Sequence, residues 1–180
     1  MMFKKPELLA PAGNYEKAMI AFHYGADAVY VGGTVFGLRK YADNLSDSEL
    51  KNLITYANKH NKLVYIVLNA FAHNSDLKPI KAYLKLLETL QPHALIVSDI
   101  GVMKLVKTYT SIPLHVSTQA SATNAFACQY YKDLGASRVI LAREVSINDC
   151  IEIKKTCNTE LEIFVHGAMC ASYSGKCVIS

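Results

Sequence analysis

Short apolar runs alternate with longer amphipathic segments along this chain, and that alternation limits the fold more than any other feature. Seven runs rich in apolar residues, many of them β-branched, recur along the sequence. Each run is apolar on both faces, which is typical of strands buried in a parallel sheet. We expect these strands at residues 7–11, 28–32, 62–70, 93–98, 114–118, 138–142 and 160–166.

Six segments with helical periodicity lie between the expected strands. The first begins at the candidate N-cap Asn14 and ends at Gly25. In the second, Ser46 is followed three residues later by Glu49, the pattern of a capping box. The sequence therefore predicts helices at residues 14–25, 46–60, 76–90, 100–109, 122–135 and 147–157.

Alternating strands and helices predict a parallel α/β protein. A doubly wound sheet would carry a glycine-rich GxGxxG stretch after the first strand, but the sequence there reads APAGN. The alternative is a TIM-barrel-like (β/α) barrel, which needs eight units and about 250 residues. We therefore expect one barrel-like domain over residues 1–180, truncated after its seventh strand and the cysteine-containing loop that follows, and forming the N-terminal part of a longer chain.

The composition limits the class of protein and the compartment that we expect. Apolar residues make up 51% of the 180 residues and charged residues 19%, as expected of a folded, soluble protein. No apolar run approaches the roughly 18 residues that cross a bilayer, and the first residues do not form a signal peptide. Five cysteines, an odd number, do not indicate a disulfide framework, so we expect a reducing, cytoplasmic location. The net charge of +4 indicates a solvated lysine-rich surface, with a weak preference for nucleic acid left open.

Small or polar residues occupy nearly every position where an expected strand ends. In a parallel barrel these positions meet at one rim, where function collects. Asn69, Ser117 and Gln119 are the candidates for substrate binding, and Glu144 and His166 are candidates for moving protons. The alternative for any single one of these residues is an ordinary helix cap or turn.

Two of the three arginines are placed to reach the same rim. Arg143 ends the sixth strand, and Arg39 lies in the long loop after the second strand. A guanidinium group binds carboxylate or phosphate through two parallel hydrogen bonds. We therefore interpret Arg39 and Arg143 as an anion clamp, with an ion pair between Arg143 and an acid such as Glu144 as the alternative.

Two cysteines follow the seventh strand, on the side where the site is expected. Cys170 and Cys177 are separated by a small-residue spacer that lets the chain fold back and bring two sulfurs together. Thiolates bind zinc or an iron–sulfur cluster, but either site needs further ligands, of which His166 is one candidate for zinc. The spacing alone leaves metal binding, a reactive thiol and a chance pair open.

The final residues, EIFVHGAMCASYSGKCVIS, resemble the signature of peptidase family U32, the collagenase-like proteases. Every position of that signature is matched, from Glu162 to Ser180. Further blocks of the chain resemble the family in the same order: ELLAPAGN, GADAVYVGG, Arg39 with Ala42 and Asn44, LNAF, SDIG, HVSTQAS and LGASRVILARE. The resemblance therefore extends along the whole chain.

Membership of this family implies properties that the spacing does not give. The family has a TIM-barrel-like N-terminal region followed by more chain, and some members are peptidases. Other members take part in oxygen-independent hydroxylation of tRNA uridine, rRNA cytidine or the ubiquinone ring, in which prephenate is implicated. In those members four cysteines hold a [4Fe–4S] cluster, and Cys170 and Cys177 match two of the four. The resemblance thus implies a cluster in the full-length protein that is incomplete within this chain.

These residues are compatible with three functions. The first is prephenate-linked hydroxylation of RNA, with Arg143, Glu144 and His166 as catalytic residues. The second is a metal-dependent endopeptidase acting on protein or peptide, although no HExxH helix is present. A serine triad would use Ser117, His166 and Asp99, but no serine is marked as a nucleophile, and a cysteine protease would pair Cys170 with His166. The third is a non-catalytic scaffold. A homodimer through an open edge of the barrel is a further expectation.

Overall fold

The computed structural model describes residues 5–33, 44–69, 71–167 and 170–176. Within these ranges seven parallel strands alternate with six α-helices and two short 3₁₀ turns. The strands are β1 (Leu9–Pro11), β2 (Ala28–Gly32), β3 (Leu63–Leu68), β4 (Ala94–Val97), β5 (Leu114–Val116), β6 (Arg138–Ile140) and β7 (Glu160–Glu162). The helices are α1 (Tyr15–His23), α2 (Asp47–Lys59), α3 (Leu77–Leu90), α4 (Ile100–Tyr109), α5 (Ala125–Asp133) and α6 (Ile147–Thr156).

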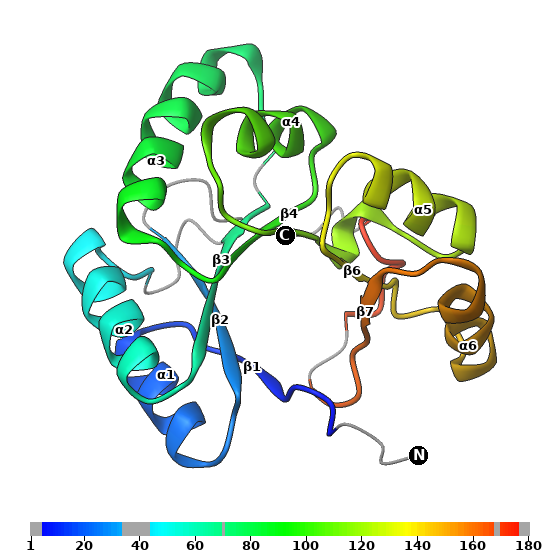
Figure 1. Cartoon of the computed structure of the whole chain (residues 1–180), viewed down its shortest axis with the longest axis horizontal. Helices are drawn as coiled ribbons and strands as arrows, with labels where there is room; N and C mark the ends of the chain where they lie inside the picture. Colours follow the sequence, from blue (N-terminus) through cyan, green and yellow to red (C-terminus); the bar gives the residue numbers. More distant parts are fainter. Residues whose placement is uncertain (1–4, 34–43, 70, 168–169, 177–180) are drawn as a thin grey trace.

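The seven strands form one parallel sheet in sequence order, from β1 to β7. The sheet curls into an open ring with the helices outside it, as Figure 1 shows looking down the ring. No pairing between described residues joins β7 back to β1. The predicted TIM-barrel-like fold is therefore confirmed, as a curled half-barrel of seven strands.

Helix starts are set by side chains that satisfy free backbone N–H groups. Asn14 accepts from the Lys17 N–H, and Ser46 forms the predicted capping box with Glu49. Asp99 accepts from the Val102 N–H at 2.8 Å, so this strand-end carboxylate is a helix cap. Asn124 and Ser146 cap α5 and α6 in the same way.

Most of the core lies between the sheet and the helices. Apolar side chains of the strands, such as Val29, Ile66 and Leu95, pack with buried side chains of the helices, such as Leu84 of α3 and Met103 of α4. A second, smaller apolar cluster fills the inside of the ring. Within the described ranges, every helix is too short or too polar to span a lipid bilayer.

The expectation that every strand is apolar on both faces is wrong for the end of the ring opposite the site. Arg138 on β6 donates to both carboxylate oxygens of Glu7, at 2.7 and 3.2 Å, and also binds Glu160 and Glu162 on β7. Tyr65 donates to Glu7 at 2.8 Å. Because Glu7 precedes β1, Arg138 links the two ends of the sheet, which are not joined by strand pairing between described residues.

Six of the seven strands are shorter than the sequence predicts, and only β2 keeps its expected bounds. β5 stops at Val116 because the Ser117 hydroxyl accepts the Gln119 N–H and the chain enters a 3₁₀ turn over Thr118–Ala120. β7 stops at Glu162, well before the expected end at residue 166. Among the described residues β7 has a paired neighbour on one side only, so fewer hydrogen bonds extend it.

Candidate functional site

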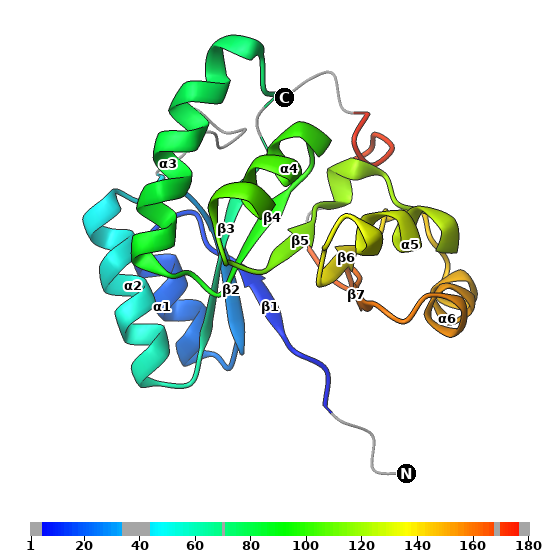
Figure 2. The same ribbon diagram turned by 45° about the horizontal axis from the view of Figure 1, so that its top comes forward.

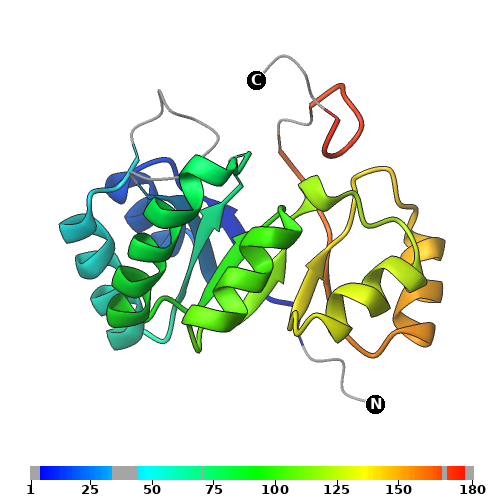
Figure 3. The ribbon, with the colours of Figure 1, turned by 90° about the horizontal axis from the view of Figure 1, so that it is seen from above.

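The segment that follows β7 returns across the rim where the other strands end. Figures 2 and 3 show residues 170–176, drawn in red, on the side of the ring toward which the strands point. These residues are called the cysteine loop below. The loop lies beside the ends of β5 and β6, so the topology brings Cys170 close to Arg143 and Glu144.

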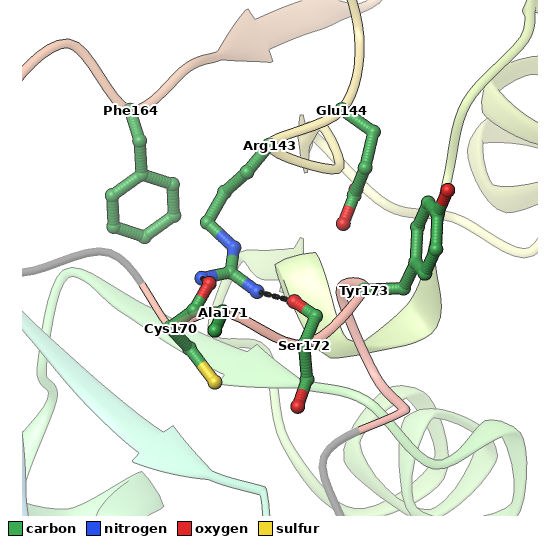
Figure 4. A pocket seen from close by; sticks show the side chains of 7 residues that line it. All are labelled: Arg143, Glu144, Phe164, Cys170, Ala171, Ser172 and Tyr173. Carbon is green, nitrogen blue, oxygen red and sulfur yellow. Dashed lines mark hydrogen bonds between the residues drawn. The ribbon is translucent and has the colours of Figure 1, made fainter.

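Arg143 holds the cysteine loop through two backbone carbonyl groups. Its Nη1 donates to the Cys170 carbonyl at 2.9 Å, and its Nη2 donates to the Ser172 carbonyl at 2.6 Å (Figure 4). Charge-assisted hydrogen bonds are among the stronger ones in proteins. The alternative of an ion pair between Arg143 and a neighbouring acid does not occur among the described residues, because the guanidinium faces carbonyl groups instead.

Ser174 is the buried centre of the same network. Its hydroxyl accepts from the Arg143 backbone N–H at 3.1 Å and from Arg143 Nε at 3.2 Å. Its backbone N–H donates to Glu144 Oε1 at 2.6 Å. The Thr118 hydroxyl donates to the Ser174 hydroxyl at 3.4 Å. Ser174 is buried, with 3% of its surface exposed. One small side chain thus ties the loop to the end of β6 and to the turn after β5.

Gly175 lets the loop pack directly on the turn after β5. Its φ of +73° lies in the left-handed region, which glycine adopts at little cost. A Cβ atom at this position would overlap the carbonyl oxygen of Gln119 and the hydroxyl of Ser121. The Ser121 hydroxyl donates to the Ser174 carbonyl. The close approach of the two backbones therefore requires glycine at position 175.

A pocket of about 310 Å³ opens where the cysteine loop meets the rim. Cys170 is exposed there with a free thiol, and Figure 4 shows its carbonyl oxygen facing the Arg143 guanidinium while its sulfur points away. Phe164 and Tyr173 contribute aromatic side chains to the same lining. The remaining lining residues are Glu144, Ala171 and Ser172.

The carboxyl group of Glu144 is held in its ionised form. Burial tends to raise the pKa of its carboxyl, but backbone N–H groups, including that of Ser174, donate to it and outweigh burial. The net pKa lies below the ordinary value of a glutamate. Glu144 is therefore ionised at neutral pH and able to accept a proton from a molecule in the pocket.

Asn69 and Ser117 meet at the ends of β3 and β5. Asn69 Nδ2 donates to Ser117 Oγ at 2.9 Å, and the Gln119 N–H donates to the same oxygen at 3.2 Å. The Asn69 Oδ1 atom is buried and has no hydrogen-bond partner among the described residues. A buried carbonyl oxygen without a donor costs free energy, so this amide has capacity to bind a ligand.

The predicted site residues are brought together only in part. Arg143, Glu144 and Cys170 share one pocket, and Asn69, Ser117 and Gln119 form a second polar group near the same rim. His166 is exposed and makes no hydrogen bond within the described part of the chain. Arg39 and Cys177 lie outside the described residues. The roles assigned to these residues stay predictions.

Sequence reasoning did not identify four residues that shape the pocket. Ser174 and Gly175 belong to the small-residue spacer between the two cysteines, and the Ser-Gly dipeptide is the signal that could have indicated a tight turn there. Phe164 and Tyr173 were not singled out, since an aromatic residue beside a strand end or in a loop carries no distinctive pattern. Their position next to Arg143 depends on how the loop folds back.

Neither a metal site nor a protease triad is complete among the described residues. No group of three or more histidine, cysteine, aspartate or glutamate side chains converges there. Asp99 is engaged as the cap of α4. No hydrogen bond in the described ranges joins a histidine ring to Ser117 or Cys170, as a nucleophile and its base would require.

A parallel barrel with a carboxylate, an arginine and a free thiol at the carboxyl rim of its strands has the organisation of a (β/α)-barrel enzyme. The family model of peptidase family U32 matches residues 13–180. The chain therefore belongs to peptidase family U32, an enzyme family.

Two curated relatives match nearly the whole chain. The tRNA hydroxylation protein P of Helicobacter pylori strain 26695 is 49% identical over 97% of this chain and 42% of its own length. The tRNA hydroxylation protein P1 of Bacillus subtilis strain 168 is 44% identical over 98% of this chain and 42% of its own length. The chain thus spans less than half the length of these relatives.

A solved structure supports the fold. The U32 peptidase Mk0906 superposes with a TM-score of 0.72 over 91% of this chain and 71% of its own chain. The two sequences are 14% identical, so this likeness concerns the fold alone.

Proposed function

We propose that this chain forms the N-terminal part of an enzyme that hydroxylates RNA in the cytoplasm, most directly uridine in tRNA. The names of the two relatives support an RNA substrate, since both are tRNA hydroxylation proteins. We further propose that the reaction is iron–sulfur-dependent, oxygen-independent and linked to prephenate, as the family resemblance implies. The free state of the described cysteines is in keeping with a reducing compartment.

The observation that carries the proposal is that Cys170, with its exposed thiol, lines the same pocket as Arg143. Cys170 lies in the pocket beside Arg143, which already spends three N–H groups on the Cys170 and Ser172 carbonyls and the Ser174 hydroxyl. A guanidinium has five N–H donors, so two remain for a substrate anion. A carboxylate of a prephenate-like molecule or an RNA phosphate has the chemistry to accept them.

The fit to a [4Fe–4S] cluster is partial. An exposed thiol at a protein rim is the donor that such a cluster requires, and Cys170 is such a thiol. The described residues do not bring further cysteines to it, so the proposal places the other ligands at Cys177 and in the rest of the protein. Such a cluster would supply electron transfer, and a divalent metal ion is the alternative occupant.

Glu144 is the residue that we assign to proton transfer. Its lowered pKa keeps the carboxylate ionised next to Arg143, so it can accept a proton from a bound substrate, as a weaker base than an ordinary glutamate. His166 is a second proton carrier in this proposal, and its exposure gives it access to the solvent side of the site. Asn69, with its unpaired buried oxygen, would orient a hydroxyl or amide donor of the substrate.

A metal-dependent endopeptidase remains the second candidate, because the name of the family supports it. The experiment that separates the two starts from the protein expressed from its complete gene and purified without oxygen. The proposal predicts bound iron and sulfide and the absorption of an iron–sulfur protein, with loss of both in Cys170→Ser. Iron-free protein that cleaves gelatin would instead favour the peptidase.

A further inference from the structure

Helices α3 and α4 carry five lysines and little opposing charge on their outer side. These lysines, called the lysine face, are Lys78, Lys81, Lys85, Lys104 and Lys107. Between residues 77 and 109 they are opposed by two acids, Glu88 and Asp99, which gives this segment a net charge of +3 out of +4 for the chain. More than half of the net positive charge is therefore gathered on two neighbouring helices.

The spacing of these lysines places them on one side of each helix. Positions 78, 81 and 85 of α3, and 104 and 107 of α4, are three or four residues apart, so their side chains are neighbours. The opposite sides of both helices are buried against the sheet, through Ile80, Tyr83, Leu84, Leu87, Val102, Met103 and Val106. Figures 1 and 2 show α3 and α4 next to each other on the outside of the ring.

The charges of the lysine face are not neutralised within the described part of the chain. None of the five lysines has a carboxylate within ion-pair distance there. The two acids are occupied elsewhere, since Glu88 accepts from the N–H and hydroxyl of Ser111 and Asp99 caps α4. The five ammonium groups thus remain available to an anionic partner.

Two of the lysines are held by packing that directs them along the surface. Lys81 lies over the ring of Tyr109, with Nζ 5.4 Å from the ring centre, which joins the two helices. The stem of Lys107 lies so close to Gly135 that a Cβ atom there would be 2.9 Å from its Cε. Because this order is present before binding, less side-chain entropy is lost when an anion is bound.

We propose that the lysine face binds the phosphate backbone of the RNA substrate, an inference that rests on the proposed function. A row of unpaired ammonium groups matches a polyanion, whose bound counterions are released on contact. Protein partners usually require an apolar centre. On these two helices the only large apolar side chains that the structure describes as exposed are Ile100 and Tyr109, at the two ends of α4.

The test compares two triple variants of the protein expressed from its complete gene. The first removes charge from the face through Lys78→Gln, Lys85→Gln and Lys104→Gln, whose side chains are exposed. The second removes the same charge elsewhere, through Lys51→Gln, Lys59→Gln and Lys155→Gln. Binding of unfractionated tRNA is measured by fluorescence anisotropy between about 50 and about 200 mM KCl. Thermal unfolding of each variant checks that the fold is kept.

Each phosphate contact contributes about 0.7–0.9 to the slope of the logarithm of the association constant against the logarithm of the salt concentration. At 0.15 M salt, compared with 1 M, one such contact is worth roughly a four- to fivefold gain in affinity. The face variant should therefore bind tRNA on the order of 100-fold more weakly, with a slope reduced by about 2–3. The control variant should lose much less. Equal losses of tRNA affinity in the two variants would overturn the proposal that the lysine face binds RNA, while leaving the proposed function standing. No salt-dependent tRNA binding by the unaltered protein would overturn both.

Discussion

Substituting Ser174 with alanine tests whether the cysteine loop is held in place by its own hydrogen bonds. The hydroxyl accepts from the Arg143 N–H, Arg143 Nε and Thr118 at 3.1, 3.2 and 3.4 Å. A typical hydrogen bond contributes about 0.5–1.5 kcal/mol, and a buried N–H without an acceptor costs about 1–3 kcal/mol. Because these three contacts are long, we expect a total loss of about 2 kcal/mol.

A loss of about 2 kcal/mol raises the opening of the loop roughly 30-fold. Native-state hydrogen exchange reports such opening directly, through the amide at position 174, which binds Glu144, and that of Lys176, which binds the Tyr173 carbonyl. Amides in β3 and β4 should exchange as before, since they lie in the core.

The matched control is Ser172→Ala in the same loop. Arg143 binds only the carbonyl of Ser172, and the Ser172 hydroxyl makes no hydrogen bond within the described ranges. This control should therefore leave exchange at positions 174 and 176 within about twofold of the unaltered protein. The reasoning is refuted if Ser174→Ala changes those amides less than about threefold, or if Ser172→Ala accelerates them equally.

Three further predictions follow from contacts in the barrel. Gly175→Ala should open the cysteine loop, because a left-handed alanine costs about 1 kcal/mol and its Cβ atom would overlap the Gln119 carbonyl. Faster tryptic cleavage after Lys176 with unchanged thermal unfolding would confirm this. Cleavage at the same rate as in the unaltered protein would contradict it. Arg138→Ala should lower the free energy of unfolding by about 3–5 kcal/mol in urea, because it leaves three carboxylates unpaired; a loss below about 1 kcal/mol would show that the ring does not depend on this link. Burial outweighs the effect of Arg138 and raises the pKa of the Glu162 carboxyl to about 6. The protonated carboxyl therefore contributes about 2 kcal/mol to the free energy of unfolding below pH ~4.5, and this contribution is lost as the pH rises through 6. Glu162→Gln should remove this dependence of stability on pH. Urea unfolding from pH ~4 to ~7 checks the last prediction, and parallel curves for the two proteins would contradict it.

Local patterns of the sequence were sufficient to predict most of the elements. The periodicity of 100–109 gave α4 with its bounds, and the pair Ser46 and Glu49 gave the start of α2. Such elements are determined by nearest neighbours in the chain. The curl of the sheet into a ring also followed from the count and order of the strands.

The contacts that shape the site and the ring interior could not be read in this way. Arg138 binds Glu7 across the ring, and this link joins residues 131 positions apart in the sequence. The use of Arg143 on the carbonyls of Cys170 and Ser172 depends on how residues after β7 fold back. Carbonyl groups are present at every residue, so no sequence pattern indicates which of them an arginine will bind.

The measurement that tests the central claim most directly is mass spectrometry of nucleosides from the tRNA of cells that lack the gene. The account predicts that hydroxylated uridine derivatives disappear, that the unaltered gene restores them, and that a gene carrying Cys170→Ser does not. An unchanged set of modified nucleosides in cells without the gene would contradict RNA hydroxylation as the function of this protein.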